Sequence, residues 1–449
     1  MTQATNRKIQ NAWAFYDWAN SVYPLVISTA IFPIYFNAVT TSEENGVVSD
    51  TVSFLGITLV NTQLYSYVIA ASLLVVMVMS PILSGAADYA GKKKFFLQLF
   101  CYIGALACGG MFFFSTDHLE LSMLAVFLAS IGYWSSIVFY NAYLPEIAAP
   151  EDHDSLSAKG FSWGYIGSVL LLIINLVMIQ LIDESLTKWS FVMVAIWWAG
   201  FAQITFRRLP SNPYNRKPEG QIWSHGLKEL RKVFFQIRSI VPLRRYLFAF
   251  FVFSMAVQTI MLMAQFFGMK EVHVVTDATG AGYAMYPPLV SQHTGLDTGE
   301  LIIAIILVQL IAVPGAWLFS RGSGKFGNIR MIGIALVCWI GACLYAFFAV
   351  DTPNEFFITA GLIGFMMGGT QSLSRSTYSK MLPETHDHAS FFSFYDVLEK
   401  LGIVIGMISF GYIEGLTGSM RNSVLSLIVF FGVGLILLFF VPKSKPSLP

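Results

Sequence analysis

Long apolar segments alternate with short polar breaks along almost the whole chain. Each segment has about 20 residues, which is the length that an α-helix needs to cross a bilayer. Charged or turn-forming residues stand at every break. The pattern therefore predicts an all-α integral membrane protein with twelve transmembrane helices. The predicted helices are 13–38, 62–86, 95–115, 121–143, 160–182, 189–206, 244–268, 300–320, 331–350, 356–378, 389–413 and 422–441.

Lysine and arginine are distributed unevenly among the polar breaks. If both termini are cytoplasmic, 22 of the 27 basic residues face the cytoplasm and only Lys188, Lys270 and Arg421 face outward. Arg375 and Lys400 fall within helices or at their cytoplasmic ends. Because cytoplasmic loops are enriched in lysine and arginine, we expect both termini in the cytoplasm.

The two halves of the chain carry related residues at a constant offset of 238 positions. Such internal repeats are common in transporters. They predict two pseudo-symmetric six-helix halves, 1–206 and 244–449, joined by a cytoplasmic linker, 207–243. The related pairs are Pro145 and Pro383, Gly164 and Gly402, Ser168 and Gly406, Phe15 and Phe253, Asn20 and Gln258, and Ser21 and Thr259.

The linker contains an amphipathic pattern. Apolar residues recur at alternating spacings of four and three, and most of the basic residues fall elsewhere on the helix. This pattern predicts a helix that lies on the anionic inner leaflet. The apolar residues are Trp223, Leu227, Leu230, Phe234, Ile237 and Val241, and the basic ones are Lys228, Arg231, Lys232 and Arg238.

Composition supports the membrane assignment, since 55% of the residues are hydrophobic and only 12% are charged. A net charge of +1 gives no indication of a nucleic-acid partner. The four cysteines lie in apolar runs, where we expect buried free thiols. Residues 1–11 are polar and the first apolar run is too long for a cleavable signal, so none is expected.

Catalytic and ATP-binding signals are missing from the sequence. A G-x-x-x-x-G-K-[ST] phosphate loop does not occur, which disfavours ATP-driven transport. All seven histidines fall in or beside predicted loops, so a membrane-embedded enzyme is disfavoured too. His386, Asp387 and His388 form the one local cluster, which we interpret as a solvated loop in preference to a metal site. No cofactor or metal is expected.

After the second predicted helix the chain reads SGAADYAGKKK (84–94). This segment resembles the G-x-x-x-D-x-x-G-[RK]-[RK] loop of the major facilitator superfamily. Asp88, Gly91, Lys92 and Lys93 match, and Ser84 replaces the leading glycine. The equivalent loop 321–330 lacks the aspartate. The resemblance implies that Asp88 belongs to a cytoplasmic latch that braces helix 2 against helix 11.

Four further motifs resemble the autophagy-related vacuolar amino-acid effluxer family and its bacterial relatives. Two features depart from that family: the long outer loop 269–298, with Tyr286-Pro287-Pro288, and the acids Asp396 and Glu399. The resemblance implies amino-acid export. The motifs are AFYDWANSVYP (14–24), FYNAYLPEIA (139–148), KGFSWGYIGS (159–168) and QSLSRSTYSKMLPE (371–384).

Asp17 is an acidic residue in an apolar span, and such residues usually serve function. At about 1.5 Å per residue it lies roughly 8 Å inside the cytoplasmic end of the first helix. The family-like motifs place further polar residues in this inner layer. We interpret the layer as a gate in which Asp17 pairs with Arg375. Two alternatives stay open, namely contact with a substrate or coupling proton and a static hydrogen bond to Asn20 or Tyr16. The gating candidates are Asp17, Asn20, Asn141, Gln371, Arg375, Asp396 and Asp88.

Lys400 stands four residues after Asp396, so the two charges are expected to neutralise each other on one helix. Fewer polar residues lie near the middle of the membrane. Pro24 can bend the first helix there and free backbone carbonyls. The substrate-binding candidates at this depth are Tyr23, Tyr133, Trp134, Gln258, Thr259 and Gln309.

The sequence thus predicts a secondary active or facilitative transporter of a small solute that works by alternating access. Amino-acid export is the foremost expectation, in the inner membrane of a bacterium and as a monomer. Uptake or efflux of another metabolite, a peptide or a drug is the alternative within this class. A receptor or scaffold with the same frame is the alternative outside it.

Overall fold

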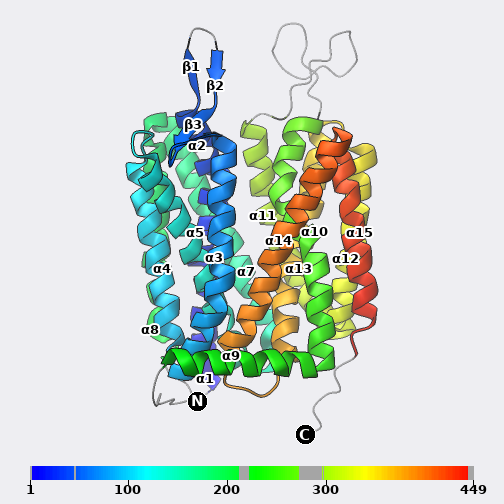
Figure 1. The fold of residues 1–449 in the computed structure, drawn as a ribbon. Helices are drawn as coiled ribbons and strands as arrows, with labels where there is room; N and C mark the ends of the chain where they lie inside the picture. Colours follow the sequence, from blue (N-terminus) through cyan, green and yellow to red (C-terminus); the bar gives the residue numbers. More distant parts are fainter. Residues whose placement is uncertain (1–2, 45–46, 212–221, 273–295, 297, 443–449) are drawn as a thin grey trace. The chain divides into compact units, whose positions relative to one another are not determined.

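The computed structural model describes residues 3–44, 47–211, 222–272, 296 and 298–442. The Tyr286-Pro287-Pro288 part of the outer loop and the side chain of Trp223 lie outside this description. The chain divides into two compact units (Figure 1). Unit 1 comprises Met1–Ile240 and Ser379–Lys400, and unit 2 comprises Val241–Tyr378 and Leu401–Pro449. The segment 379–400 therefore groups with the N-terminal part of the chain.

Eleven of the helices in the described part of the chain are long and apolar enough to cross a membrane. The twelfth long apolar helix of the sequence pattern is α14 (His388–Thr417), which carries Asp396, Glu399 and Lys400 in its first half. Together with α14, these eleven make up the twelve helices of an all-α membrane protein.

The helices of unit 1 pack against both sequence neighbours and sequence-distant helices. α4 contacts α5 and α8, α1 contacts α7 and α8, and α3 contacts α5 and α9. The long helices are α1 (Gln3–Asn20), α3 (Asn61–Ala90), α4 (Lys93–Gly110), α5 (Leu119–Asn141), α7 (His153–Val177), α8 (Thr187–Arg208) and α9 (Ile222–Ser239). The short ones are α2 (Phe32–Thr40), η2 (Met111–Phe113), α6 (Leu144–Ile147), η3 (Pro150–Asp152), η4 (Met178–Ile182) and η5 (Glu184–Leu186).

Unit 2 is built from longer, uninterrupted helices, among which α15 contacts both α10 and α12. They are α10 (Val241–Glu271), α11 (Thr298–Phe326), α12 (Asn328–Ala349), α13 (Pro353–Met381), α14 and α15 (Met420–Phe439). The last three residues of α13 and the first half of α14 belong to unit 1.

The first membrane span is not one regular α-helix. A π-helix, η1 (Tyr23–Ile31), separates α1 from α2. Pro24 has no N–H, so it cannot donate to the carbonyl four residues earlier. Its own carbonyl accepts a hydrogen bond from the Thr29 hydroxyl at 2.8 Å. The sequence places an irregularity at Pro24 correctly, and the hydroxyl of Thr29 satisfies one of the carbonyls involved.

Two small antiparallel hairpins precede α3, and the apolar pattern gives no sign of them. β1 (Ser42–Glu44) pairs with β2 (Val47–Ser49), with Ser42 opposite Ser49. β3 (Thr51–Phe54) pairs with β4 (Ile57–Val60), with Thr51 opposite Val60. Strands of three or four residues are too short to show a clear alternation of apolar and polar positions.

The small residues at the 238-residue offset serve close helix packing in each unit. A Cβ on Gly164 of α7 would lie 2.4 Å from the hydroxyl oxygen of Ser21. A Cβ on Gly406 of α14 would lie 2.2 Å from the hydroxyl oxygen of Thr259 on α10. Ser21 and Thr259 are themselves one of the offset pairs. In both units a glycine thus lets a helix backbone approach a hydroxyl side chain on its neighbour.

Candidate transport site

Asp17 is buried in unit 1, with 4% of its surface exposed. Its Oδ2 accepts a 2.8 Å hydrogen bond from the Tyr140 hydroxyl near the end of α5. Trp13, one turn earlier on α1, stacks on the Tyr140 ring at 4.5 Å between ring centroids and donates its indole N–H to the Tyr140 carbonyl. Asp17 therefore has a partner on another helix, and it lies level with the end of α5, as the sequence predicts.

Two asparagines flank this bond. Asn20 is 1% exposed and its Oδ1 lies 3.4 Å from the hydroxyl oxygen of Ser21, while Asn141 is 8% exposed. Asp17 and Arg375 belong to different units, so their pairing stays a prediction.

Asp88 lies at the end of α3 and binds the start of α14. Its two carboxylate oxygens accept the backbone N–H groups of Ala389, at 3.2 Å, and Ser390, at 2.7 Å. These N–H groups belong to the first turn of α14, where they have no partner within the helix. A carboxylate at a helix N-terminus also interacts favourably with the helix dipole. The contact joins the two helices that the resemblance implies for Asp88, and its gating role stays a prediction.

Glu146, on α6, holds the centre of the same buried contact. Its Oε1 forms an ion pair with the ammonium of Lys93 and lies 3.0 Å from Nδ1 of His388. The side chain of Glu146 is 1% exposed and that of Lys93 is 3% exposed. Lys93 also lies 3.9 Å from Asp88. We call Asp88, Lys93, Glu146 and His388, with the amides of Ala389 and Ser390, the α14 contact.

The solvated-loop interpretation of His386, Asp387 and His388 is wrong for two of the three residues. His386 is exposed, but Asp387 and His388 are 3% and 6% exposed. The loop is buried because it enters α14, whose first turn Asp88 and Glu146 hold against unit 1. Within the described residues, no group of three or more histidine, cysteine or acidic side chains could hold a metal ion.

Two outer ion pairs extend the α14 contact. Lys380 lies 2.6 Å from Asp154 on α7. Lys232 on α9 lies 3.5 Å from Asp387 and 3.1 Å from Glu229. Partial burial lowers the pKa of Lys232, but the hydrogen bond to Glu229 and the charge of Asp387 outweigh it and raise that pKa above its usual value. Both ends of the segment 379–387 are thus fixed to unit 1 by salt bridges.

Asp396 and Lys400 form the expected ion pair on α14, and both side chains are buried, at 4% and 0% exposure. The Lys400 ammonium also lies over the ring of Trp134 on α5, 4.1 Å from its centroid. Among the described residues, Oδ2 of Asp396 is a buried acceptor without a hydrogen-bond partner. The structure therefore brings a gating candidate and a substrate candidate together, through a lysine that the sequence analysis did not assign to the site.

The aromatic substrate candidates of unit 1 are also adjacent. Tyr23 stacks on Tyr133 at 4.9 Å between ring centroids, and Tyr133 lies edge-on to Trp134 at 5.1 Å. Tyr23 is 2% exposed, whereas Tyr133 and Trp134 are half-buried. These three rings form a continuous surface that ends at Lys400.

The candidates in unit 2 are less concentrated. Thr259 is fully buried against Gly406, and its hydroxyl donates to the Met255 carbonyl at 2.6 Å. Gln258 and Gln309 are half-buried. Gln371 is half-buried too and donates to the sulfur of Met261 at 3.3 Å, and Arg375 is 4% exposed. Thr259 is therefore occupied by packing within its own unit.

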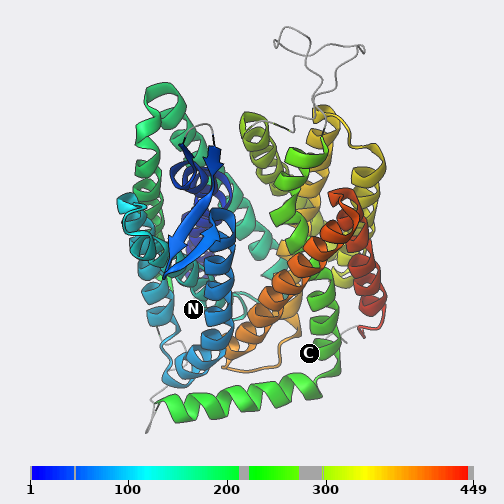
Figure 2. The same cartoon turned by 45° about the horizontal axis from the view of Figure 1, so that its top comes forward.

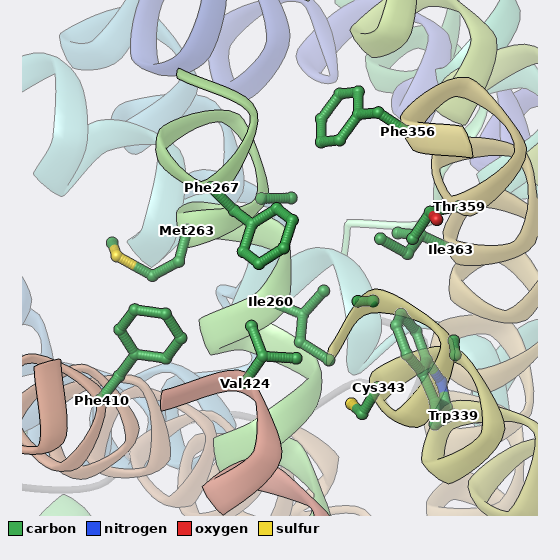
Figure 3. Close-up of a pocket in the computed structure, with 13 residues that line it drawn as sticks. Ile260, Met263, Phe267, Trp339, Cys343, Phe356, Thr359, Ile363, Phe410 and Val424 are labelled. Atoms are coloured by element: carbon green, nitrogen blue, oxygen red, sulfur yellow. The ribbon is translucent and has the colours of Figure 1, made fainter. Parts of the chain in front are cut away.

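Unit 2 contains a separate apolar cavity of about 40 Å³ among α10, α12, α13, α14 and α15 (Figure 3). Its one hydroxyl-bearing residue, Thr359, donates to the Glu355 carbonyl. The lining residues are Ile260, Met263, Ala264, Phe267, Trp339, Ala342, Cys343, Ala346, Phe356, Thr359, Ile363, Phe410 and Val424.

The four cysteines differ in burial. Cys343 is buried, as are Cys101 and Cys108. Cys338 is exposed, contrary to expectation, because its position on α12 faces away from the unit.

Comparison with known proteins identifies the family. The family model described as "Vacuole effluxer Atg22 like" matches residues 5–447. The chain belongs to the Atg22-like vacuole effluxer family. The Bacillus subtilis (strain 168) protein named "Uncharacterized MFS-type transporter YxiO" is 29% identical over 98% of this chain and 96% of its own length. The "Autophagy-related protein 22-1" of Phaeosphaeria nodorum is 22% identical over 95% of this chain and 89% of its own.

Solved structures show the same fold. The Escherichia coli fucose:proton symporter FucP superposes with a TM-score of 0.67 at 12% identity, over 98% of this chain and 99% of its own. The human organic anion transporter MFSD10 gives 0.66 at 12% identity, over 97% and 98%. This Atg22-like chain is therefore a multi-pass membrane transporter with the major facilitator fold.

Sequence reasoning missed three members of the buried clusters: Glu146, His388 and, as a site residue, Lys400. Glu146 was visible only as part of the motif FYNAYLPEIA, and His388 only as a loop histidine. A signal did exist for Lys400, since a lysine inside a membrane span is as unusual as an aspartate. The i, i+4 spacing indicated only that Lys400 neutralises Asp396.

Proposed function

We propose that this transporter moves amino acids, with export as its working direction. The observation that carries the proposal is the buried pair of Asp396 and Lys400 against Trp134. An isolated charge inside a membrane unit is costly, but a neutral pair is far less so. An amino-acid zwitterion is also a neutral pair, so it can exchange with the internal one without leaving a net charge.

Each group of the pair has a counterpart on the zwitterion. The substrate carboxylate would bind the ammonium of Lys400, and the substrate ammonium would bind Asp396, whose Oδ2 is the buried acceptor without a partner in the described structure. Trp134 and Tyr133 offer aromatic faces to an apolar side chain. The family is named for a vacuole effluxer and its fungal members are autophagy-related proteins, which supports a role in solute release.

Purified protein in liposomes tests the proposal. Vesicles preloaded with an unlabelled amino-acid mixture should exchange it for radiolabelled leucine or tyrosine, while labelled fucose should stay outside. Leucinamide, which lacks the carboxylate, and 4-methylpentanoate, which lacks the amine, should compete poorly. If no amino acid exchanges, or if both analogues compete as well as leucine, the zwitterion hypothesis is wrong.

Variants of the pair separate binding from folding. We expect Lys400→Gln and Asp396→Asn each to reduce exchange at least tenfold, which is the effect of losing about 1.4 kcal/mol of binding. The matched control is Lys270→Gln with Glu414→Gln, which removes an exposed salt bridge of 2.7 Å in unit 2 and should leave exchange unchanged. Equal loss in both sets would mean that charge removal only damages the fold.

We place the protein in the plasma membrane of a bacterium with both termini in the cytoplasm, because 22 of its 27 basic residues then face the cytoplasm. A C-terminal green fluorescent protein fusion should fluoresce and a C-terminal alkaline phosphatase fusion should be inactive. The opposite result would reverse the orientation.

A further inference from the structure

Helix α9 is fixed to unit 1 along one side. Gly226 packs against the end of α3 so closely that a Cβ on it would lie 2.7 Å from the backbone nitrogen of Ala86. Val233, two turns later, is fully buried. In Figures 1 and 2, α9 lies crosswise to α3 at the end of the unit where α14 begins. Residues seven apart share a helix face, so Gly226 and Val233 define the side of α9 that faces the unit.

The side of α9 that faces away from the unit carries exposed apolar and basic residues. Leu227, Phe234 and Phe235 are each about half exposed, at 50%, 48% and 50%. Lys228, Arg231, Lys232 and Arg238 are exposed as well. Leu227, Arg231, Phe234 and Arg238 follow the spacing four, three, four, which places them along one line of the helix. This surface differs from the stripe that the sequence predicts, because the unit buries Gly226 and Val233 and leaves about half of the surface of Leu227 and of Phe234 exposed.

Two contacts connect α9 to the α14 contact. The Lys232 ammonium lies 3.5 Å from Asp387, and the next residue, His388, is the partner of Glu146. The ring of Phe234 lies 6.1 Å from that of Phe394 in the second turn of α14. A shift of α9 relative to α3 would therefore pull on the segment whose amides Asp88 binds.

We propose that the exposed face of α9 binds anionic phospholipid headgroups at the bilayer surface, and that this binding holds the segment 379–400 on unit 1. Basic residues near an anionic leaflet each raise the affinity for it roughly fivefold, and exposed aromatic side chains enter the headgroup region. A lysine ammonium has three donors, so Lys232 can keep Asp387 while it binds a lipid phosphate. This lipid contact is independent of the solute that the protein carries.

Hydrogen–deuterium exchange of the full chain in nanodiscs tests the proposal. The nanodiscs contain phosphatidylcholine alone or phosphatidylcholine mixed with phosphatidylglycerol. In the anionic lipid we expect several-fold slower exchange in α9 and in peptides that cover 382–391. Glycerol phosphate added to phosphatidylcholine nanodiscs should give no protection. If it protects as well as the lipid, the site binds free anions and the bilayer proposal is wrong.

Variants separate the lipid contact from its connection to α14. Lys228→Gln with Arg231→Gln should abolish the effect of phosphatidylglycerol on both regions. Arg7→Gln with Lys92→Gln removes the same charge from exposed positions of unit 1 outside α9 and should preserve it. Lys232→Gln should keep most of the protection of α9 and lose that of 382–391. Lipid protection that survives in the Lys228/Arg231 variant, or that never reaches 382–391, would overturn the proposal.

Discussion

The α14 contact of unit 1 and the apolar cavity of unit 2 are two buried regions of one membrane protein that are built in opposite ways. In the first, Asp88, Lys93, Glu146 and His388 bind one another and two backbone amides through directional contacts. In the second, thirteen mainly apolar side chains surround a void of about 40 Å³. A directional contact has one favourable arrangement, whereas hydrocarbon surfaces pack in many.

The difference indicates which buried region can switch between two discrete arrangements and which can only adjust gradually. Breaking the α14 contact leaves buried charges and amides without partners, so the contact is either made or fully broken. Apolar side chains around a void can shift gradually at small cost. We therefore expect substitutions in unit 1 to act strongly and specifically, and substitutions around the cavity to act weakly and in proportion to volume.

The largest effect is expected for Glu146→Gln. Lys93 would lose its nearest carboxylate while staying buried, and removing one partner of a buried ion pair costs about 3–5 kcal/mol. The free energy of unfolding, measured by titration with sodium dodecyl sulfate in mixed micelles, should fall by this amount. Glu151→Gln, an exposed acid near the start of α7, is the matched control and should change it little.

A double variant tests whether the charges themselves are needed for stability. Lys93→Met with Glu146→Leu would give the α14 contact an interior like that of the cavity lining. Replacing a buried ion pair by apolar residues of similar size is often neutral or stabilising, so this variant should be more stable than Glu146→Gln. If the double variant is the less stable one, the comparison between the two regions fails.

The next largest effect is expected for Asp88→Ala. Its loss leaves the amides of Ala389 and Ser390 buried without an acceptor, at a cost of about 1–3 kcal/mol for each amide. Hydrogen exchange of the peptide that starts α14 should become faster by at least tenfold. Asp88→Asn keeps one carbonyl oxygen, so an intermediate rate is expected. Unchanged exchange in Asp88→Ala would mean that the two hydrogen bonds do not hold the helix.

Sequence patterns predicted most of the fold because each signal is local. Apolar runs of about 20 residues are enough to place twelve helices, and Pro24 marks the irregular first span. The position of Asp88 followed from a motif, and its contact with α14 agrees with what that motif implies. The hairpins before α3 were missed because their strands are too short for a period-two pattern.

Long-range partners could not be predicted in this way. Glu146 and His388 are 242 positions apart, and neither spacing nor composition indicates that they touch. The pair of Asp396 and Lys400 was predictable, because four residues along a helix bring two side chains to one face. That Lys400 lies over Trp134 was not predictable, since it depends on how α14 packs against α5.

A moderate effect is expected for Tyr140→Phe, which removes the hydrogen bond to Asp17 and keeps the ring that stacks on Trp13. Loss of one buried hydrogen bond to a charged group costs about 1.5–3 kcal/mol. The free energy of unfolding in mixed micelles measures it. Tyr102→Phe is the control, because the Tyr102 hydroxyl accepts an exposed 3.0 Å hydrogen bond from Nε2 of Gln203; it should lose well under 1 kcal/mol by the usual scale of net hydrogen-bond energies. If both variants lose the same free energy of unfolding, the buried hydrogen bond from Tyr140 to Asp17 stabilises the protein no more than an exposed one.

The smallest effect is expected for Ala342→Val, in the apolar cavity of unit 2. Two added methyl groups would fill much of the void, and at about 24 cal/mol per Å³ of cavity the gain is at most about 1 kcal/mol. Ala335→Val, on the same helix but fully buried outside the cavity, should instead lose about 1–3 kcal/mol by overpacking. Opposite signs in the two variants would confirm that the void is a real and tolerant part of unit 2. A loss of several kcal/mol in Ala342→Val would mean that the cavity lining is as specific as the α14 contact, and the contrast between the two regions would no longer hold.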